Sequence, residues 1–143
     1  VLEQYDLDAA YRVLENEKMP GWLFMAKSGA NTIWEAWEGT SAQEGIASLD
    51  HYSKGACCEW VFREMCGIHV DGKNHFVIAP HPGGHFTYAA TSYESVFGTV
   101  KSGWKKKADG TFAYQIEIPA NTTADILLPD GSRKTVSAGM YEF

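Results

Sequence analysis

The sequence has 143 residues, of which 45% are apolar and 21% are charged, and its net charge is −6. The length corresponds to about one ordinary domain, and the composition excludes a chain that is disordered throughout. No apolar run approaches the roughly 18 residues of a membrane-spanning helix. The acidic balance argues against nucleic acid or an anionic membrane surface as a partner. We therefore expect a folded chain that binds neither.

The first half of the sequence has the periodicity of helices. Apolar residues recur at helical spacing over 8–17. Pro20 ends that helix and suits the first turn of a second, short helix over 21–27. The sequence thus predicts two consecutive helices before residue 28.

The strongest helical pattern covers residues 50–66. Apolar residues form one stripe at a spacing of 3.6, and Glu59 and Arg63 form an exposed pair four residues apart. Ser48 or Asp50 would cap this helix, and Gly67 would end it. The pattern predicts one continuous helix.

From His69 onward the period changes to two, which is typical of strands. Turn dipeptides such as Asp109-Gly110 recur between the alternating segments. Short strands at regular spacing predict an antiparallel sandwich. Seven are expected, near residues 75–79, 86–92, 97–105, 111–118, 123–128, 133–137 and 139–143.

The fold class is therefore α+β, with helices over 1–67 and an antiparallel β-sandwich over 68–143. About three helices do not make a complete helical domain, because each apolar stripe must be covered by another element. Either the helices fold onto the sandwich, or they are the end of a larger helical domain. The absence of an initiator Met favours a missing N-terminal part.

The segment 28–37 interrupts the helical half with Gly, Asn and β-branched residues, so we expect an extended strand or a loop. If it is extended, Glu35 and Trp37 share a face, and a carboxylate beside an indole suits sugar chemistry. If it is helical, Trp34 and Trp37 share a face and Glu35 is a surface residue. His51, just before the long helix, could hydrogen-bond a ligand hydroxyl or only local backbone.

Metal sites and disulfides have little support in the sequence. His75, His81 and His85 lie in strand or loop sequence, and Pro-Gly-Gly between the last two prevents a helix that would align them. Three cysteines, two of them adjacent, do not form a disulfide framework. The basic cluster 105–107 is interpreted as the solvated end of a hairpin. We expect no metal and no cofactor.

Two motifs resemble a known family. The run Gly29–Trp37, followed by Ser48-Leu49-Asp50-His51-Tyr52 and Gly55, resembles the C-terminal part of the bacterial α-L-rhamnosidases of glycoside hydrolase family 78. That family shows Gly-Ala-Thr-Thr-x-Trp-Glu-x-Trp and then Ser-Leu-Asn-His before a Trp-bearing helix. Asn31 and Asp50 replace the usual Thr and Asn. The resemblance extends from Tyr5 to Phe143, through Ile118-Pro119-Ala120-Asn121 in the second half.

The resemblance implies the end of an (α/α)6 catalytic barrel followed by a C-terminal β-sandwich. It implies inverting hydrolysis of terminal α-L-rhamnose, with a rhamnose-containing glycoside as the substrate. By position, Glu35 matches the general base and His51 a sugar-contacting histidine. Trp34 and Trp37 would form the pocket wall.

Inverting hydrolysis also needs a general acid, about 6.5–9.5 Å from the base. The family's acid lies upstream of this chain, and Glu38 and Glu44 match no family acid. We therefore expect a C-terminal fragment that is inactive alone. Its uncovered helical faces, around Trp22, Trp34 and Trp60, are expected to support self-association.

A different function class remains open. The chain could be a carbohydrate-binding or accessory β-sandwich without catalysis, in which sandwich aromatics such as Tyr88, Tyr93 and Trp104 bind the sugar. The sandwich could also serve only as a structural cap on the barrel. The compartment is equally open, since both the bacterial periplasm and the cytoplasm are compatible with the sequence.

Overall fold

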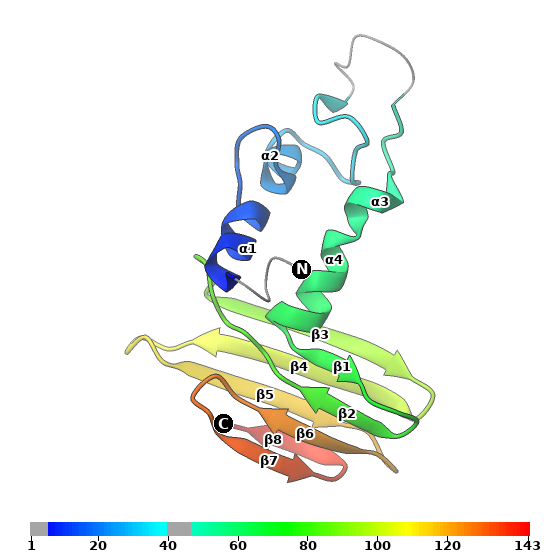
Figure 1. Cartoon of the computed structure of the whole chain (residues 1–143), viewed down its shortest axis with the longest axis vertical. Coiled ribbons are helices and arrows are strands. Elements are labelled where there is room, and N and C mark those ends of the chain that lie inside the picture. The colour runs from blue at the N-terminus through cyan, green and yellow to red at the C-terminus, as the bar shows by residue number, and fades with distance from the viewer. Residues whose placement is uncertain (1–5, 40–46) are drawn as a thin grey trace. The chain divides into compact units, whose positions relative to one another are not determined.

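The computed structural model describes residues 6–39 and 47–143, in two compact units. Unit 1 is Val1–Cys58 and unit 2 is Glu59–Phe143 (Figure 1). Within the described residues, no helix has the length and apolar character needed to cross a membrane. The expected domain boundary between residues 67 and 68 stays a prediction.

Two short helices open unit 1, as predicted. Helix α1 (Leu7–Leu14) begins where the Asp6 carboxylate accepts a hydrogen bond from the Ala9 N–H at 2.8 Å. Helix α2 (Trp22–Lys27) buries Met25. The first helix ends earlier than expected because the Asn16 side chain donates to the Pro20 carbonyl at 2.6 Å, which closes a turn between the helices.

The single helix expected over 50–66 is wrong. The chain forms α3 (Tyr52–Gly55), α4 (Cys57–Trp60) and a π-helical turn, η3 (Val61–Met65). Gly55 lies where the first two pieces meet, and glycine has a poor helix propensity. The π-helical turn closes with a hydrogen bond of 3.0 Å from the Cys66 N–H to the Val61 carbonyl, five residues back.

The predicted C-terminal end of this helical region is confirmed, whereas neither predicted N-cap residue occupies the N-cap position. The N-cap position is His51, without a side-chain hydrogen bond, and Ser48 Oγ instead accepts from the Asp50 N–H at 3.1 Å. Gly67 does end the region, with φ +74. A Cβ there would lie 2.1 Å from the carbonyl carbon of Ala79, so both the dihedral and the close approach require glycine.

Unit 2 contains two four-stranded sheets that face each other (Figure 1). Their orders are β1–β2–β6–β7 and β3–β4–β5–β8. All pairs are antiparallel except β2 with β6, so the predicted sandwich is confirmed with one parallel pair. The strands are β1 (Ile68–Val70), β2 (His75–Ile78), β3 (Tyr88–Ser95), β4 (Gly98–Lys106), β5 (Phe112–Ile118), β6 (Thr123–Leu127), β7 (Arg133–Val136) and β8 (Gly139–Glu142).

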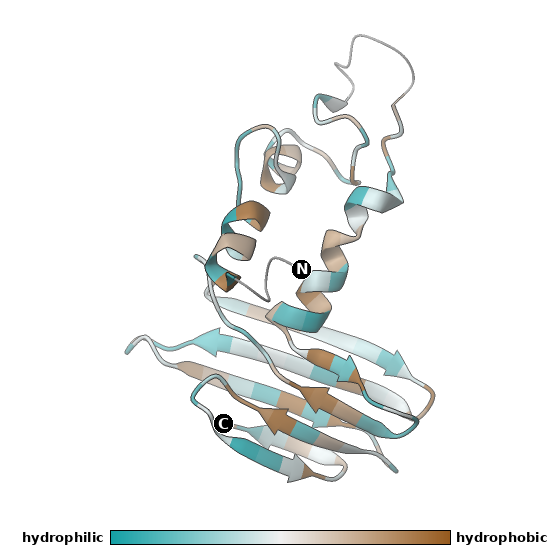
Figure 2. Cartoon of the chain, in the orientation of Figure 1, coloured by the Kyte–Doolittle hydropathy of each residue, from teal (hydrophilic) through white to brown (hydrophobic). Residues whose placement is uncertain are grey.

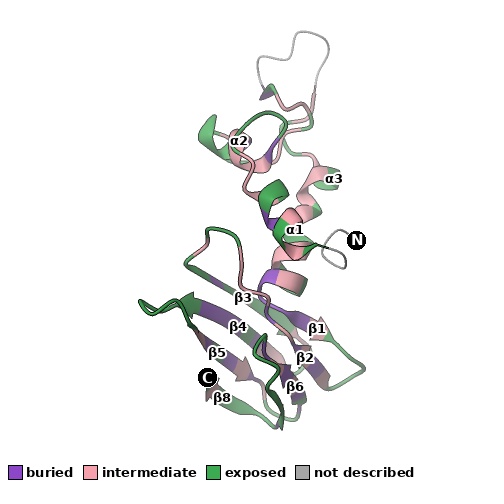
Figure 3. Ribbon diagram, turned by 60° about the vertical axis from the view of Figure 1, so that its left-hand side comes forward, coloured by how far each residue is buried: buried purple, intermediate pink, exposed green. Residues whose placement is uncertain are grey.

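The core of unit 2 lies between the sheets. Hydrophobic residues and buried residues recur along the strands of both sheets (Figures 2 and 3). The buried members of the core include Phe76, Ile78, Val100, Trp104, Ile116, Ile118, Ala124 and Ile126. Two polar groups in this core bond to the backbone at the end of the π-helical turn. Trp104 Nε1 donates to the Met65 carbonyl at 2.8 Å, and Ser102 Oγ donates to the Cys66 carbonyl at 2.6 Å. These bonds fix residues 65–66 against β4.

Candidate functional site

The segment 28–38 consists of turns, bends and coil, so the expected break in the helical half is confirmed. It is neither an extended strand nor a helix. The shared faces that either regular structure would give to Glu35, Trp34 and Trp37 therefore do not occur. Its side chains are placed by hydrogen bonds to a second segment, residues 48–51.

Backbone hydrogen bonds bring these two segments together within unit 1. The Glu35 N–H donates to the Ser48 carbonyl at 2.8 Å, and the His51 N–H donates to the Ile33 carbonyl at 2.7 Å. The Thr32 hydroxyl adds a bond to the Leu49 carbonyl. The two motifs that carry the sequence prediction therefore lie side by side.

The carboxylate of Glu35 is held in a defined orientation. Its Oε2 accepts a hydrogen bond from the Ser48 N–H at 2.8 Å, and the residue is exposed. Within residues 6–39 and 47–143, no hydrogen bond engages Oε1. The site thus offers one carboxylate oxygen fixed by the backbone and one that can accept a proton from water.

His51 is half-buried and its ring stacks on Tyr52, with centroids 5.9 Å apart and planes at 27°. Its Nδ1 is buried and lacks a hydrogen-bond partner among the described residues. A buried nitrogen without a partner is costly. His51 therefore has hydrogen-bonding capacity that the described part of unit 1 does not use.

The two tryptophans are half-buried and occupy different surroundings. Trp37 packs edge-to-face on Trp22, with ring centroids 5.8 Å apart, and Lys54 Nζ lies 3.7 Å from its ring centroid. Trp34 lies against Gly39, where a Cβ would come within 2.4 Å of the indole. A cavity of about 460 Å³ in unit 1 is lined by Trp37 and Trp22, but not by Trp34.

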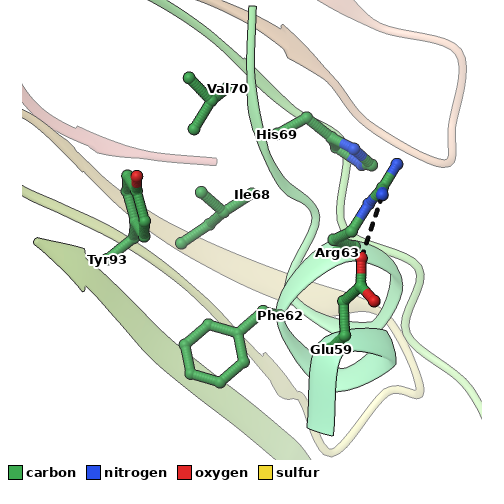
Figure 4. A pocket seen from close by; sticks show the side chains of 7 residues that line it. All are labelled: Glu59, Phe62, Arg63, Ile68, His69, Val70 and Tyr93. Atoms are coloured by element: carbon green, nitrogen blue, oxygen red, sulfur yellow. Dashed lines mark hydrogen bonds and ion pairs between the residues drawn. The ribbon is translucent and has the colours of Figure 1, made fainter. Parts of the chain in front are cut away.

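A second pocket, of about 550 Å³, lies in unit 2 (Figure 4). Phe62, Ile68 and Tyr93 form an apolar wall, and an ion pair of 3.2 Å between Arg63 and Glu59 lies at its polar side. The pocket contains none of the residues predicted for the catalytic site, and of the alternative sugar contacts it contains Tyr93. The sequence pattern did not reveal the pocket itself. The ion pair confirms the predicted pairing four residues apart.

His69 also lines the pocket of Figure 4. Burial lowers the pKa of this histidine, and the nearby Glu64 carboxylate opposes that effect. The imidazole is therefore biased towards its neutral form.

A groove also runs over the outer surface of the β3–β4–β5–β8 sheet. Two adjoining cavities, of about 700 and 630 Å³, share Ala90, Gly103, Gln115 and Glu142. Ala90 and Gly103 face each other across β3 and β4, so small side chains form the floor. Tyr88, 69% exposed, stands at one side. We call this feature the outer groove.

The three sandwich aromatics named as alternative sugar contacts have different environments in the structure. Trp104 is 3% exposed and belongs to the core, so its prediction as a ligand contact is wrong. Strand alternation could have placed it inward, because Trp104 shares a face with buried Val100 and Ser102. Tyr93 lines the pocket of Figure 4, and Tyr88 lines the outer groove.

Metal-ligating side chains do not cluster in the described residues, where no group of three or more is placed to hold an ion. His75 pairs instead with the Thr123 hydroxyl at 2.7 Å and with the Asp125 carboxylate at 3.5 Å. His81 Nδ1 lies 3.5 Å from the Glu64 carboxylate. These histidines connect neighbouring elements of unit 2.

Comparison with known proteins identifies both halves of the chain. Residues 1–65 match the model of the bacterial alpha-L-rhamnosidase 6 hairpin glycosidase domain. Residues 69–141 match the bacterial alpha-L-rhamnosidase C-terminal domain. The first match ends with η3 and the second begins within β1, so residues 66–68 lie between them.

Curated relatives carry the same name. An alpha-L-rhamnosidase of Formosa agariphila is 33% identical over 99% of this chain, which spans 16% of that protein. One from Streptomyces avermitilis is 33% identical over 85% of this chain and is matched over 12% of its own length. The chain therefore spans less than a fifth of either relative.

Solved structures agree on the fold. The alpha-L-rhamnosidase of Aspergillus terreus superposes on 99% of this chain with a TM-score of 0.91 at 27% identity, over 18% of its own length. The Streptomyces avermitilis enzyme, solved in complex with L-rhamnose, gives 0.85 at 28% identity and covers 99% of this chain and 16% of its own. The chain belongs to the bacterial α-L-rhamnosidase family and contains residues of its six-hairpin glycosidase domain and its C-terminal domain.

Proposed function

We propose that this chain is the C-terminal part of an enzyme that removes terminal α-L-rhamnose by inverting hydrolysis, with Glu35 as its general base. The observation that carries the proposal is the pairing of residues 33–35 with 48–51. It fixes the Glu35 carboxylate through the Ser48 N–H at 2.8 Å. The family membership of both halves supports the reaction class.

The chemistry divides between this chain and the rest of the enzyme. Glu35 takes a proton from water, and that water attacks the anomeric carbon from the face opposite the leaving group. A general acid must protonate the departing oxygen, and two carboxyl groups about 6.5–9.5 Å apart accommodate the water. Glu38 is exposed and matches no family acid, and Glu44 lies outside the described residues. We infer that the acid lies in the part of the barrel upstream, so the chain alone is inactive.

The other predicted site residues act on the sugar rather than on the reacting bond. His51 would hydrogen-bond a hydroxyl of rhamnose. Trp34 and Trp37 would cover the apolar C–H face of the ring with their indoles. The proposed boundary between catalytic barrel and sandwich falls between residues 67 and 68, directly after the sharp turn at Gly67.

The stereochemistry of the first-formed product tests the mechanism. The full-length enzyme should release β-L-rhamnose first from an aryl α-L-rhamnoside, as followed by proton NMR before mutarotation. In a Glu35→Ala variant, water loses its base and turnover should fall at least about 10³-fold. Azide needs no deprotonation, so it should attack the anomeric carbon directly and give β-L-rhamnosyl azide. First release of the α-anomer would contradict inversion, and undiminished turnover would contradict the role of Glu35.

A second candidate function is carbohydrate binding by the sandwich, which the outer groove favours. Its exposed Tyr88 offers a stacking surface, and Gln115 and Glu142 offer polar partners across the small-residue floor. Titration of the chain with rhamnose-containing oligosaccharides, followed by calorimetry, distinguishes the candidates. Binding that Tyr88→Ala removes and Glu35→Gln leaves intact would favour the sandwich as the binding module.

A further inference from the structure

We propose that Lys54 is a positioning residue for the Glu35 loop, holding both the backbone of the proposed base and the ring of Trp37. This inference rests on the proposed function of Glu35. Lys54 lies on α3, three residues after His51, and was not singled out by the sequence motifs. Its contacts with Trp22, Glu35 and Trp37 lie within unit 1.

The side chain of Lys54 makes two contacts with the loop. Its Nζ donates a hydrogen bond to the Glu35 carbonyl. The same ammonium lies 3.7 Å from the centroid of the Trp37 ring, a cation–π geometry. One charged group therefore fixes two loop residues that are two positions apart.

The backbone of Lys54 is fixed in turn by α2. Trp22 Nε1 donates to the Lys54 carbonyl at 3.0 Å. The Trp22 and Trp37 rings pack edge-to-face at 85°, with centroids 5.8 Å apart. Lys54, Trp37 and Trp22 thus form a closed ring of contacts, so the ammonium is anchored rather than free at the end of a flexible side chain.

The peptide groups around Glu35 depend on two different residues. Ser48 holds the Glu35 N–H and its carboxylate, whereas Lys54 holds its carbonyl. Loss of the Lys54 ammonium would release the carbonyl side of the loop and leave the Ser48 contacts in place. A misplacement of a catalytic group by about 1 Å can cost about 10²-fold in rate. Lys54 positions the proposed base through the Glu35 carbonyl, so its loss should fall mainly on kcat, whereas loosening of the Trp37 ring should change KM by a smaller factor.

The experiment uses the full-length rhamnosidase that contains this chain, with an aryl α-L-rhamnoside as substrate. Lys54→Met removes the charge at similar length, and Lys54→Arg restores a cation and a donor. Lys27→Met is the matched control, because Lys27 is an exposed lysine of the same unit, paired with Glu17 at 2.5 Å. Lys54→Gln is a milder variant that decides the question if Lys54→Met does not fold.

We expect Lys54→Met to lower kcat about 10- to 100-fold, with KM changed less than threefold. Lys54→Gln should lower kcat in the same direction with an unchanged Tm, Lys54→Arg should recover most of the loss, and Lys27→Met should match the wild type. A kcat within twofold of wild type in folded Lys54→Met or Lys54→Gln would overturn the proposal. So would a loss confined to KM.

Glu35→Gln, measured in the same series, separates the proposed role of Lys54 from the proposed role of Glu35 as the general base. If Glu35→Gln keeps wild-type turnover, the proposed function is wrong. If Glu35→Gln is inactive while the Lys54 variants turn over normally, the role of Lys54 alone is wrong.

Discussion

The backbone N–H of Ser48 donates a hydrogen bond of 2.8 Å to the carboxylate of Glu35, thirteen residues earlier in the chain. The same two residues also pair through the Glu35 N–H and the Ser48 carbonyl, at 2.8 Å. A carboxylate that accepts a backbone hydrogen bond is held without the entropic cost of ordering a second side chain. Ser48 therefore orients Glu35 through its main chain.

This relationship predicts that the backbone donor matters and the Ser48 hydroxyl does not. Ser48→Pro removes the N–H, so we expect kcat of the full-length enzyme to fall about 10- to 100-fold, because the carboxylate loses its fixed direction. Ser48→Ala keeps the N–H and is the control, expected to stay within about threefold of wild type. Steady-state kinetics measure both, with Tm as a check on folding. Equal kcat in the two variants would contradict the prediction.

The exposed apolar residues of unit 1 predict self-association of the isolated chain. Val13, Met19 and Leu49 are 43–49% exposed, and Tyr52 is 87% exposed. Apolar surface that a larger enzyme would cover tends to find a partner when it is left open. Light scattering coupled to size exclusion should give a mass above that of the monomer. Leu49→Ser with Tyr52→Ser should shift the mass towards the monomer, whereas a monomeric wild-type chain at high concentration would contradict the account.

The three cysteines should differ sharply in reactivity. Burial raises the pKa of Cys66 to about 11. Burial, and to a smaller extent the neighbouring Cys58, raises the pKa of Cys57 to about 11. The thiolate is the reactive form, so at pH 8 only about one thiol in 10³ of either residue is ionised. Mass spectrometry after iodoacetamide treatment should show exposed Cys58 modified first and Cys66 last. Early modification of Cys66 would contradict its burial.

Two glycines with similar backbone angles predict different costs of substitution. A Cβ added at Gly67 (φ +74) would lie 2.1 Å from the backbone of Ala79. A Cβ added at Gly72 (φ +82) would meet open space. Gly72→Ala should cost only the left-handed strain, about 1–2 kcal/mol. Gly67→Ala adds a backbone clash, so its free energy of unfolding should fall by about 4 kcal/mol or more. Urea unfolding measures both, and equal losses would refute the close approach at Gly67.

The strands were predictable where the alternation of side chains is long. Strand β5 (Phe112–Ile118) buries every second residue from Tyr114 onward, and a half-buried strand must show that period. Strand β1 (Ile68–Val70) was missed because three residues give no measurable period. The parallel pairing of β2 with β6 could not be predicted either. Alternation shows which side chains share a face of a strand, but it does not show which strands are neighbours in the sheet.

The helical half shows what periodicity leaves out. The apolar stripe over 50–66 identified helical backbone correctly, but it reports side-chain spacing only. The break near Gly55 and the π-helical bond from Cys66 to Val61 depend on backbone hydrogen bonds that the stripe does not encode. An interior glycine in the pattern was the available signal for the break.

The sequence motifs predicted candidate members of the site but not their arrangement. The functional roles of Glu35 and His51 stay predictions, and the structure brings the two residues together on paired segments. The contacts of Glu35 with Ser48 and Lys54 join residues 13 and 19 positions apart, so no local pattern contains them. Only the fold of unit 1 reveals that Lys54 belongs with the loop.

The most direct test of the central claim is the turnover of an aryl α-L-rhamnoside by the full-length enzyme carrying Glu35→Gln. Glu38→Gln is the matched control, because Glu38 is an exposed carboxylate three residues away. If Glu35 is the general base, Glu35→Gln should lower kcat by about 10³-fold or more while Glu38→Gln stays near wild type. Wild-type turnover by Glu35→Gln, or hydrolysis by the 143-residue chain alone that Glu35→Gln abolishes, would contradict the account.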